Sequence, residues 1–391
     1  MANQLKFYPN KMAGLYIHVP FCKSRCIYCG FYSTTALSLR DAYVKSLCRE
    51  MEMRGRNVMF HHLSTIYIGG GTPSQLSTVH LHDIFNCIDD VFHVDEDAEI
   101  TLECNPDDIT PAFAESLRSF PVNRVSMGVQ TFDDMRLTFL GRRHSAAQIP
   151  QAIYRLREIG IKNISIDMMF GFPEETLKEW SDDIDKALAL HVEHVSAYSL
   201  MYEEGTPLYN IREKRLKEGL VDQDAEDELS ARMYELLLEK MENAGFEHYE
   251  ISNFALRNAN GSFRSRHNSS YWQGIPYLGV GAAAHSYDID TRQWNVADIQ
   301  QYIRAIDKGE IPSEKEVMTD EIRYNDAITT DMRTIEGIAL EKLPEKFKSY
   351  LLQQAQKYIS QGLLALHDNH ISLTKLGLFI SDSIMSDLVY V

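Results

Sequence analysis

Apolar residues follow two different periods along roughly the first 200 residues of the chain. Short runs rich in β-branched and apolar residues predict strands at Leu15–Phe21, Thr65–Gly70, Glu99–Cys104, Arg124–Gln130, Ile164–Phe170 and His194–Leu200. Between several of them, apolar residues recur every three or four positions, which predicts amphipathic helices at Leu39–Arg54, Leu76–Val91, Ala146–Ile159 and Leu177–Leu190. Six such units predict an α/β domain with a parallel sheet. The pattern allows an open doubly wound sheet and a partial barrel equally, and either places its ligand site at the carboxyl ends of the strands.

The pattern changes after about residue 257. A long helix, Asp224–Asn243, and one strand, Glu247–Phe254, come before this point. Near the end we predict a helix at Leu343–Gln361, strands at Leu363–Leu366 and Ile371–Thr374 around the turn Asp368-Asn369, and a last helix from Lys375. This order predicts a small α+β unit that resembles a winged helix. We therefore expect two domains, 1–257 and 258–391.

The composition is that of a globular protein with an acidic surface. Lys and Arg total 39 against 56 Asp and Glu, which gives a formal net charge of −17 and argues against nucleic-acid or anionic-membrane partners. No stretch of about 18 apolar residues predicts a transmembrane helix, and the first residues lack the apolar core of a signal peptide. We therefore expect a cytoplasmic protein that associates with membranes only through partners.

Three of the six cysteines, Cys22, Cys26 and Cys29, directly follow the first predicted strand. Cytoplasmic thiols stay reduced, so this spacing favours metal binding over disulfides, and soft thiolates select iron–sulfur clusters, zinc or copper. Structural zinc sites usually use two separated pairs of ligands. No second Cys-x2-Cys pair exists, although His18 could supply a fourth ligand. Three cysteines would hold three irons of a four-iron cluster and leave the fourth open, an interpretation that we favour over zinc and over three unconnected thiols.

Glycines and polar residues end the next predicted strands. The glycine run Gly69-Gly70-Gly71-Thr72-Pro73 ends the second strand, Glu103 and Gln130 end the third and fourth, and Asp167 lies in the fifth. Taken singly, the glycines fit a tight turn and the glutamate fits an ordinary salt bridge. Because all lie near the carboxyl side of successive strands, we expect them to meet at one site. Cys48, Cys87 and Cys104 are predicted to be packed thiols.

The spacing Cys-x3-Cys-x2-Cys, with Tyr28 before the third cysteine, resembles the radical S-adenosylmethionine (SAM) superfamily. The resemblance implies a [4Fe–4S] cluster on Cys22, Cys26 and Cys29, SAM bound to the open iron, and an electron donor for the cluster. In that superfamily the reduced cluster cleaves a carbon–sulfur bond of SAM, and the protein orients the cofactor and excludes competing reactions.

The run Leu15–Cys22 resembles the start of the oxygen-independent coproporphyrinogen III oxidase family. That resemblance implies a partial (β/α)6, TIM-like barrel, followed by a C-terminal domain that covers the substrate. The positions that match the family's SAM contacts are Tyr16, Tyr28, Gly70, Gly71, Thr72, Glu103, Gln130, Arg142 and Asp167.

Two departures favour one branch of that family. The oxidases have a fourth cysteine where this chain has Phe31, and they have a longer N-terminal segment than the 21 residues that precede Cys22 here. The string from His267 to Trp272 is instead similar to a branch of haem chaperones. This similarity implies a protein that binds haem and delivers it to haem-requiring respiratory proteins. His267 is the candidate haem contact, although it could also be an ordinary structural histidine.

Two alternatives stay open. The chain could be an oxidase that decarboxylates porphyrin propionates, with Arg142, Arg143 and Arg266 as cationic partners. A zinc-stabilised interaction module is the third interpretation.

Overall fold

Six parallel strands form the centre of the protein. The computed structural model describes residues 13–55, 62–258 and 261–391. The strands lie in sequence order, each parallel to the next: β1 (Ala13–Val19), β2 (His62–Gly70), β3 (His93–Cys104), β4 (Arg124–Gln130), β5 (Asn163–Phe170) and β6 (His194–Ser199). All six predicted strands are present, although β2 and β3 begin earlier than the pattern predicted.

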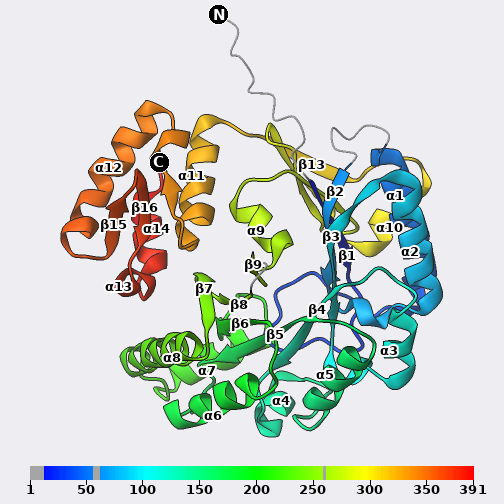
Figure 1. The fold of residues 1–391 in the computed structure, drawn as a ribbon, viewed down its shortest axis with the longest axis horizontal. Helices are drawn as coiled ribbons and strands as arrows, with labels where there is room; N and C mark the ends of the chain where they lie inside the picture. Colours follow the sequence, from blue (N-terminus) through cyan, green and yellow to red (C-terminus); the bar gives the residue numbers. More distant parts are fainter. Residues whose placement is uncertain (1–12, 56–61, 259–260) are drawn as a thin grey trace, which may run out of the picture.

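Helices cover the outer side of this curved sheet (Figure 1). They are α1 (Arg40–Gly55), α2 (Thr78–Val91), α3 (Pro111–Leu117), α4 (Asp134–Leu140), α5 (Gln148–Glu158) and α6 (Leu177–Leu188), and they include the four predicted helices. After β6 come α7 (Pro207–Lys217) and the predicted long helix α8 (Gln223–Asn243). Capping boxes at Ser77 and Thr176 fix where α2 and α6 begin. The apolar faces of helices and sheet share one large core.

Further strands extend the sheet beyond both edges of this centre. At one edge β10 (Tyr277–Val280) lies parallel to β1, and β11 (His285–Tyr287), β12 (Thr291–Asn295) and β13 (Ser313–Val317) follow antiparallel. At the other edge lie β8 (Asn253–Asn258), antiparallel to β6, then β7 (Phe246–Glu250), with β9 (Gly261–Ser262) paired to β8. Within the described ranges the strand order ends at β13 and β7, so the α/β sheet is open and does not close into a full barrel.

The prediction of one strand over Glu247–Phe254 was wrong. The chain reverses between β7 and β8 at Ile251 and Ser252, and the two halves pair as a hairpin. The Glu250 carboxylate accepts a hydrogen bond from the Ser252 backbone N–H (2.9 Å) and so closes the turn. The turn contains no glycine or proline, which are the strongest turn signals in a sequence. The sequence pattern therefore gave no indication of a turn here.

The last part of the chain has its own small core. It contains α11 (Asp320–Thr330), β14 (Ile338–Ala339), α12 (Glu345–Ser360), β15 (Leu364–His367), β16 (His370–Leu373), α13 (Lys375–Leu378) and α14 (Ser381–Leu388). Asp368 and Asn369 both have positive φ (47° and 64°) and form the predicted hairpin turn. The predicted last helix is broken into α13 and α14 around Phe379 and Ile380.

The main sheet runs across residue 257. β10 to β13 belong to it, and α10 (Ile299–Asp307) packs against α1 and contributes to the large core. The separate small core begins at Tyr324. The division into domains 1–257 and 258–391 therefore stays a prediction, with a sheet that both parts share.

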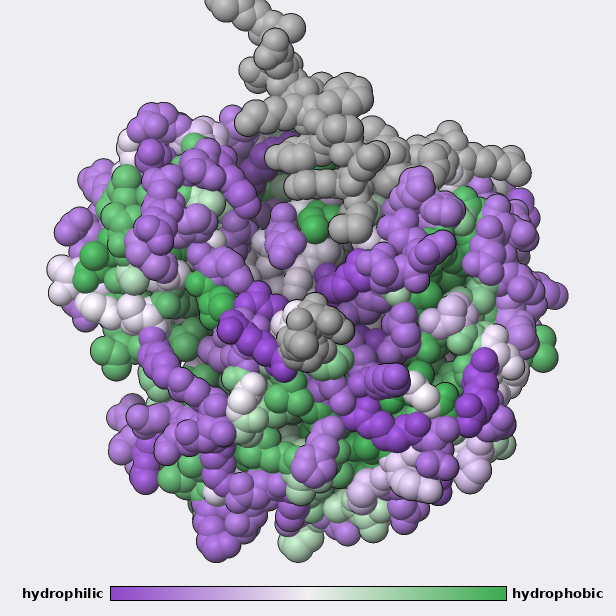
Figure 2. All heavy atoms as spheres, in the orientation of Figure 1, coloured by the Kyte–Doolittle hydropathy of each residue, from purple (hydrophilic) through white to green (hydrophobic). Residues whose placement is uncertain are grey.

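Much of the visible surface is hydrophilic. Figure 2 shows a face on which hydrophilic side chains predominate and apolar ones form scattered patches. Among the residues that the structure describes, none of the helices combines the length and the apolar character that crossing a membrane requires.

Candidate functional site

The three grouped cysteines lie in the loop between β1 and α1, at the carboxyl end of the strand. Backbone hydrogen bonds hold this loop from three sides. The Cys22 N–H donates to the Thr34 carbonyl (3.0 Å), the Ile27 N–H donates to the Leu140 carbonyl at the end of α4 (3.1 Å), and the Ile27 carbonyl accepts from the Leu208 N–H in α7 (3.0 Å). The loop is therefore held by a hydrogen bond within itself and by contacts with α4 and α7.

All three thiols are free, partly buried and exposed to one cavity of about 450 Å³. Among the described residues, they do not come within 4.8 Å of one another as a group. A tetrahedral zinc ion would need sulfur atoms about 3.8 Å apart, given Zn–S bonds of about 2.3 Å. Thiolates on separate irons of a cube lie farther apart. The spacing thus fits a [4Fe–4S] cluster better than a single ion.

Arg142 joins the cysteine loop to the strand ends. One of its guanidinium nitrogens donates to Cys26 Sγ (3.7 Å), and the other donates to Asn105 Oδ1 (2.7 Å) and the Gly128 carbonyl (2.6 Å). Burial raises the pKa of the Cys22 and Cys29 thiols. Thiolates therefore need positive charge beside them, and Arg142 supplies part of it.

The glycine run at the end of β2 provides space as well as a turn. Gly70 has φ +114°, which favours glycine. A Cβ on Gly69 would lie 2.8 Å from Glu103 Oε1, and one on Gly71 would lie 2.7 Å from the backbone of Pro20, just before the cysteine loop. The run therefore allows three chain segments to approach one another at the cavity.

Glu103 is partly buried at the end of β3 and faces the cavity. Its carboxylate accepts hydrogen bonds from the Gly70 N–H (2.9 Å) and the Tyr67 hydroxyl (2.7 Å). Burial raises its pKa to about 7, and the nearby Asp167 adds to the shift. A cation that entered the cavity would favour the ionised carboxylate.

The end of β4 contributes Gln130 and the middle of β5 contributes Asp167, and both line the cavity. Gln130 has a left-handed backbone (φ 69°), and the pairing of the two strands shifts register between Gly128 and Gln130. This bulge turns the side chain to the site. Asp167 accepts a hydrogen bond from the Ser126 hydroxyl (3.4 Å), and burial raises its pKa to about 6.

Tyr16, Tyr28 and Thr72 complete the predicted set around the same cavity. Tyr16 donates to His18 Nδ1 (2.9 Å), and His18 Nε2 donates to the Tyr32 carbonyl (3.1 Å). Both ring nitrogens of His18 are thus engaged, which argues against its role as a fourth zinc ligand. The Thr72 hydroxyl donates to Cys22 Sγ (3.6 Å).

His267 lies behind this cavity rather than in it. Its fully buried ring bonds Thr65 Oγ1 through Nδ1 (2.8 Å) and the Tyr271 hydroxyl through Nε2 (2.8 Å). The ring stacks on Tyr67 (centroids 5.1 Å apart), whose hydroxyl holds Glu103. Burial lowers the pKa of His267 to about 3 and keeps it neutral. Its helix, α9 (Arg266–Trp272), thus supports the wall of the site.

Sequence reasoning missed several polar residues of the site. Asn105 accepts from Arg142, and Asp108 accepts from Arg143 (3.0 Å) and Ser74 (2.9 Å). The position of Asn105 just after the end of β3 was the available signal. Of the cations considered for propionates, Arg143 is paired with Asp107 and Asp108 and Arg266 with Asp97.

Two parts of the chain match known protein families. Residues 16–187 match the radical SAM superfamily, and residues 318–380 match the HemN C-terminal domain. The fold and the site thus define a radical SAM protein.

Relatives that match nearly the whole chain show which family it belongs to. The proteins named "Heme chaperone HemW" from Bacillus subtilis, Lactococcus lactis and Mycobacterium tuberculosis are 36%, 33% and 30% identical to this chain. The alignments cover 95%, 94% and 97% of this chain and 98%, 95% and 96% of those relatives. The chain belongs to the HemW family.

A solved structure shows the same fold. Coproporphyrinogen III oxidase (HemN) from Escherichia coli superposes with a TM-score of 0.82 over 98% of this chain and 91% of its own, at 21% sequence identity.

Proposed function

We propose that this protein is a haem chaperone, which binds haem and transfers it to haem-requiring respiratory proteins. The observation that carries the proposal is the similarity over nearly the whole chain to proteins named heme chaperones. Phe31, at the position of the oxidases' fourth cysteine, supports the same choice.

Cys22, Cys26 and Cys29 would hold a [4Fe–4S] cluster, with SAM at its open iron. The bound cluster supplies one-electron chemistry to SAM. The chain's own contribution is electrostatic. Arg142 offsets thiolate charge at Cys26, and Glu103 and Asp167 present two carboxylates to a cationic ligand. Tyr16, Tyr28, Gly70, Gly71, Thr72 and Gln130 would shape the rest of the SAM site.

The rim of the cavity suits a flat apolar ligand with anionic groups. Phe31 and Met201 line it and are 72% and 62% exposed. Arg25 also lines it, and it forms no ion pair with any residue in the described ranges. The proposed contact between haem and His267 requires a local rearrangement. The His267 ring must first lose its hydrogen bond to Thr65 or to Tyr271.

The proposal includes three further elements. Haem-accepting proteins would be the partners, an electron donor would reduce the cluster, and the protein would act in the cytoplasm. Any membrane association would come through a partner.

Two reactions of the anaerobic, cluster-loaded protein test the proposal. In the first, haemin is titrated and the loaded protein is mixed with an apo haem protein. We expect stoichiometric haem uptake followed by transfer. In the second, coproporphyrinogen III, SAM and a reductant are added, and we expect no decarboxylation. Formation of protoporphyrinogen would contradict the chaperone function in favour of the oxidase, and iron and zinc contents of the protein test the zinc alternative.

A further inference from the structure

Two histidines and an aspartate meet at the amino ends of β2 and β3, at the opposite end of these strands from the cysteine cavity. His62 and His93 are the first residues of the two strands and are direct partners in the parallel pairing. Side chains alternate along a strand, so Asp95 lies on the same face of β3 as His93. The sheet register therefore brings the three side chains together although 31 residues separate the two histidines.

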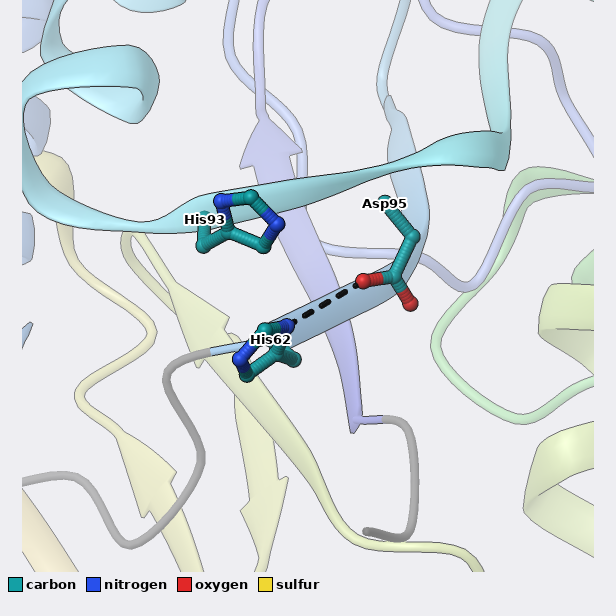
Figure 3. A group of neighbouring side chains, drawn as sticks. All are labelled: His62, His93 and Asp95. Atoms are coloured by element: carbon teal, nitrogen blue, oxygen red, sulfur yellow. Dashed lines mark hydrogen bonds and ion pairs between the residues drawn. The ribbon is translucent and has the colours of Figure 1, made fainter.

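The three side chains face one another (Figure 3). One ligand atom from each lies within 4.8 Å of the other two. His62 Nδ1 and Asp95 Oδ1 are 3.3 Å apart, and the rings of His62 and His93 lie 4.6 Å apart at 70°. The His62 side chain is 67% exposed and that of Asp95 is 22% exposed, so an ion could reach the group from solvent.

We propose that His62, His93 and Asp95 bind one divalent transition-metal ion, with zinc as the ion that the donor set fits. Two imidazoles and one carboxylate are ligands that zinc accepts, and a water molecule would take the fourth position. Zn–N bonds of about 2.0–2.1 Å place tetrahedral ligand atoms about 3.4 Å apart. Rotations of the two exposed histidine side chains would bring their nitrogens to this separation. The site would join the first residues of two neighbouring strands.

A histidine–aspartate pair alone does not make such a site, and the chain offers a comparison. His80 Nε2 and Asp41 Oδ1 lie 2.7 Å apart between α2 and α1. Among the described residues, no third histidine, cysteine or carboxylate completes that pair into a metal-binding group. His80→Ala thus controls for the loss of a carboxylate-paired histidine outside any three-ligand group. The His80 side chain is 12% exposed and also accepts the Ser77 N–H, so the folding of this variant is checked alongside.

The experiment is a calorimetric titration of Zn²⁺ into the anaerobic protein after its [4Fe–4S] cluster has been assembled, so that the cysteines are occupied. We expect one equivalent to bind in the wild type and in His80→Ala. Loss of a group that only hydrogen-bonds to a metal ligand typically costs about 10–100-fold in metal affinity. Loss of a direct ligand in His93→Ala or His62→Ala should therefore weaken binding by at least about tenfold.

A second probe identifies the ligands. Co²⁺ bound to the wild type should give a visible d–d absorption band, and this band should disappear in His93→Ala while cluster absorbance stays unchanged. The proposal is overturned if the cluster-loaded wild type binds no Zn²⁺. It is equally overturned if His93→Ala and His80→Ala bind as the wild type does. Neither outcome depends on haem binding, because the site is distant from the cysteine cavity.

Discussion

At the scale of single residues, the three grouped cysteines differ from the other three by what surrounds them. Cys22, Cys26 and Cys29 border a cavity from one loop, whereas Cys87 is buried in the apolar core, and Cys104 is buried at the end of β3 beside the same cavity. Cys48 contacts the Asp83 carbonyl between α1 and α2. The number of cysteines does not distinguish these two groups, but the spacing of the cysteines in the sequence does.

Cys26→Ser should prevent assembly of the cluster, because a hydroxyl is a poor substitute for a soft thiolate. We expect the broad visible absorbance of the anaerobically reconstituted protein to be lost. Cys87→Ser, at a buried thiol away from the cavity, is the control and should keep that absorbance if it folds. Full absorbance in Cys26→Ser would contradict the ligand assignment.

Glu103 should make the free energy of unfolding depend on pH. Its pKa is raised from 4.5 to about 7 in the folded protein, so the folded state binds the proton more tightly than the unfolded state. The stabilisation is fully present below pH about 4.5 and is lost as pH rises through about 7. The full effect is on the order of 3 kcal/mol.

Glu103→Gln removes this titration, so urea unfolding between pH 5 and 8 should show a flatter profile than the wild type. The same variant should bind SAM at least about tenfold more weakly, since a neutral amide attracts a cation less than a carboxylate does. An unchanged pH profile together with unchanged SAM affinity would show that the carboxylate has neither role.

Substitutions of His267 and Tyr271 distinguish a haem contact at His267 from a purely structural role. His267→Ala removes a fully buried ring and two hydrogen bonds and should lower the free energy of unfolding by roughly 2–4 kcal/mol. Tyr271→Phe removes only one of those bonds and should cost about 1 kcal/mol. If His267 contacts haem, the haem absorption spectrum should change in a folded His267→Gln variant and stay constant in Tyr271→Phe. An identical spectrum in both would remove the proposed contact.

At the scale of elements, the site depends on how closely strand ends and loops approach one another. Gly71 lies against the backbone of Pro20, a contact between the end of β2 and the entry to the cysteine loop. Backbone cannot move aside as a flexible side chain can, so a larger residue here displaces the loop itself.

Gly71→Ala should therefore lower cluster content after reconstitution by half or more and weaken SAM binding. Gly160→Ala is the control because a Cβ there meets nothing within 4 Å, although its φ of +95° makes alanine strained. The control should cost about 1 kcal/mol of stability and leave cluster content unchanged. Equal cluster content in both variants would show that the close approach at Gly71 is not needed.

At the scale of the whole molecule, buried Glu50 ties the early and late parts of the chain together. Its carboxylate accepts from the Gly281 N–H (2.8 Å), Asn295 Nδ2 (2.8 Å) and the Tyr302 hydroxyl (2.6 Å), and it pairs with Arg54 (3.2 Å). A single carboxylate on α1 thereby fixes β10, β12 and α10. The shared sheet and this network make the late segments part of the main body.

Glu50→Ala should lower the free energy of unfolding by about 3–5 kcal/mol, because it leaves Arg54 buried without its partner. Glu52→Ala, at an exposed position of the same helix, should change it by less than about 0.5 kcal/mol. Urea unfolding of the two variants makes the comparison. A small loss in Glu50→Ala would mean that the late segments hold to the sheet without this network.

The amino-acid pattern determined the six strands, four of the helices that cover them, the grouping of Cys22, Cys26 and Cys29, and the edge of the sheet at which the cavity forms. These are local properties, since periodicity and spacing act over a few residues. Only the tertiary structure decided the hairpin at Ile251, the addition of β10 beside β1, and the burial of His267 behind Tyr67. It also decided the meeting of His62 with His93. Each of these features joins residues that are distant in sequence or adds a chain reversal that no local pattern marks, so it depends on register and packing in three dimensions.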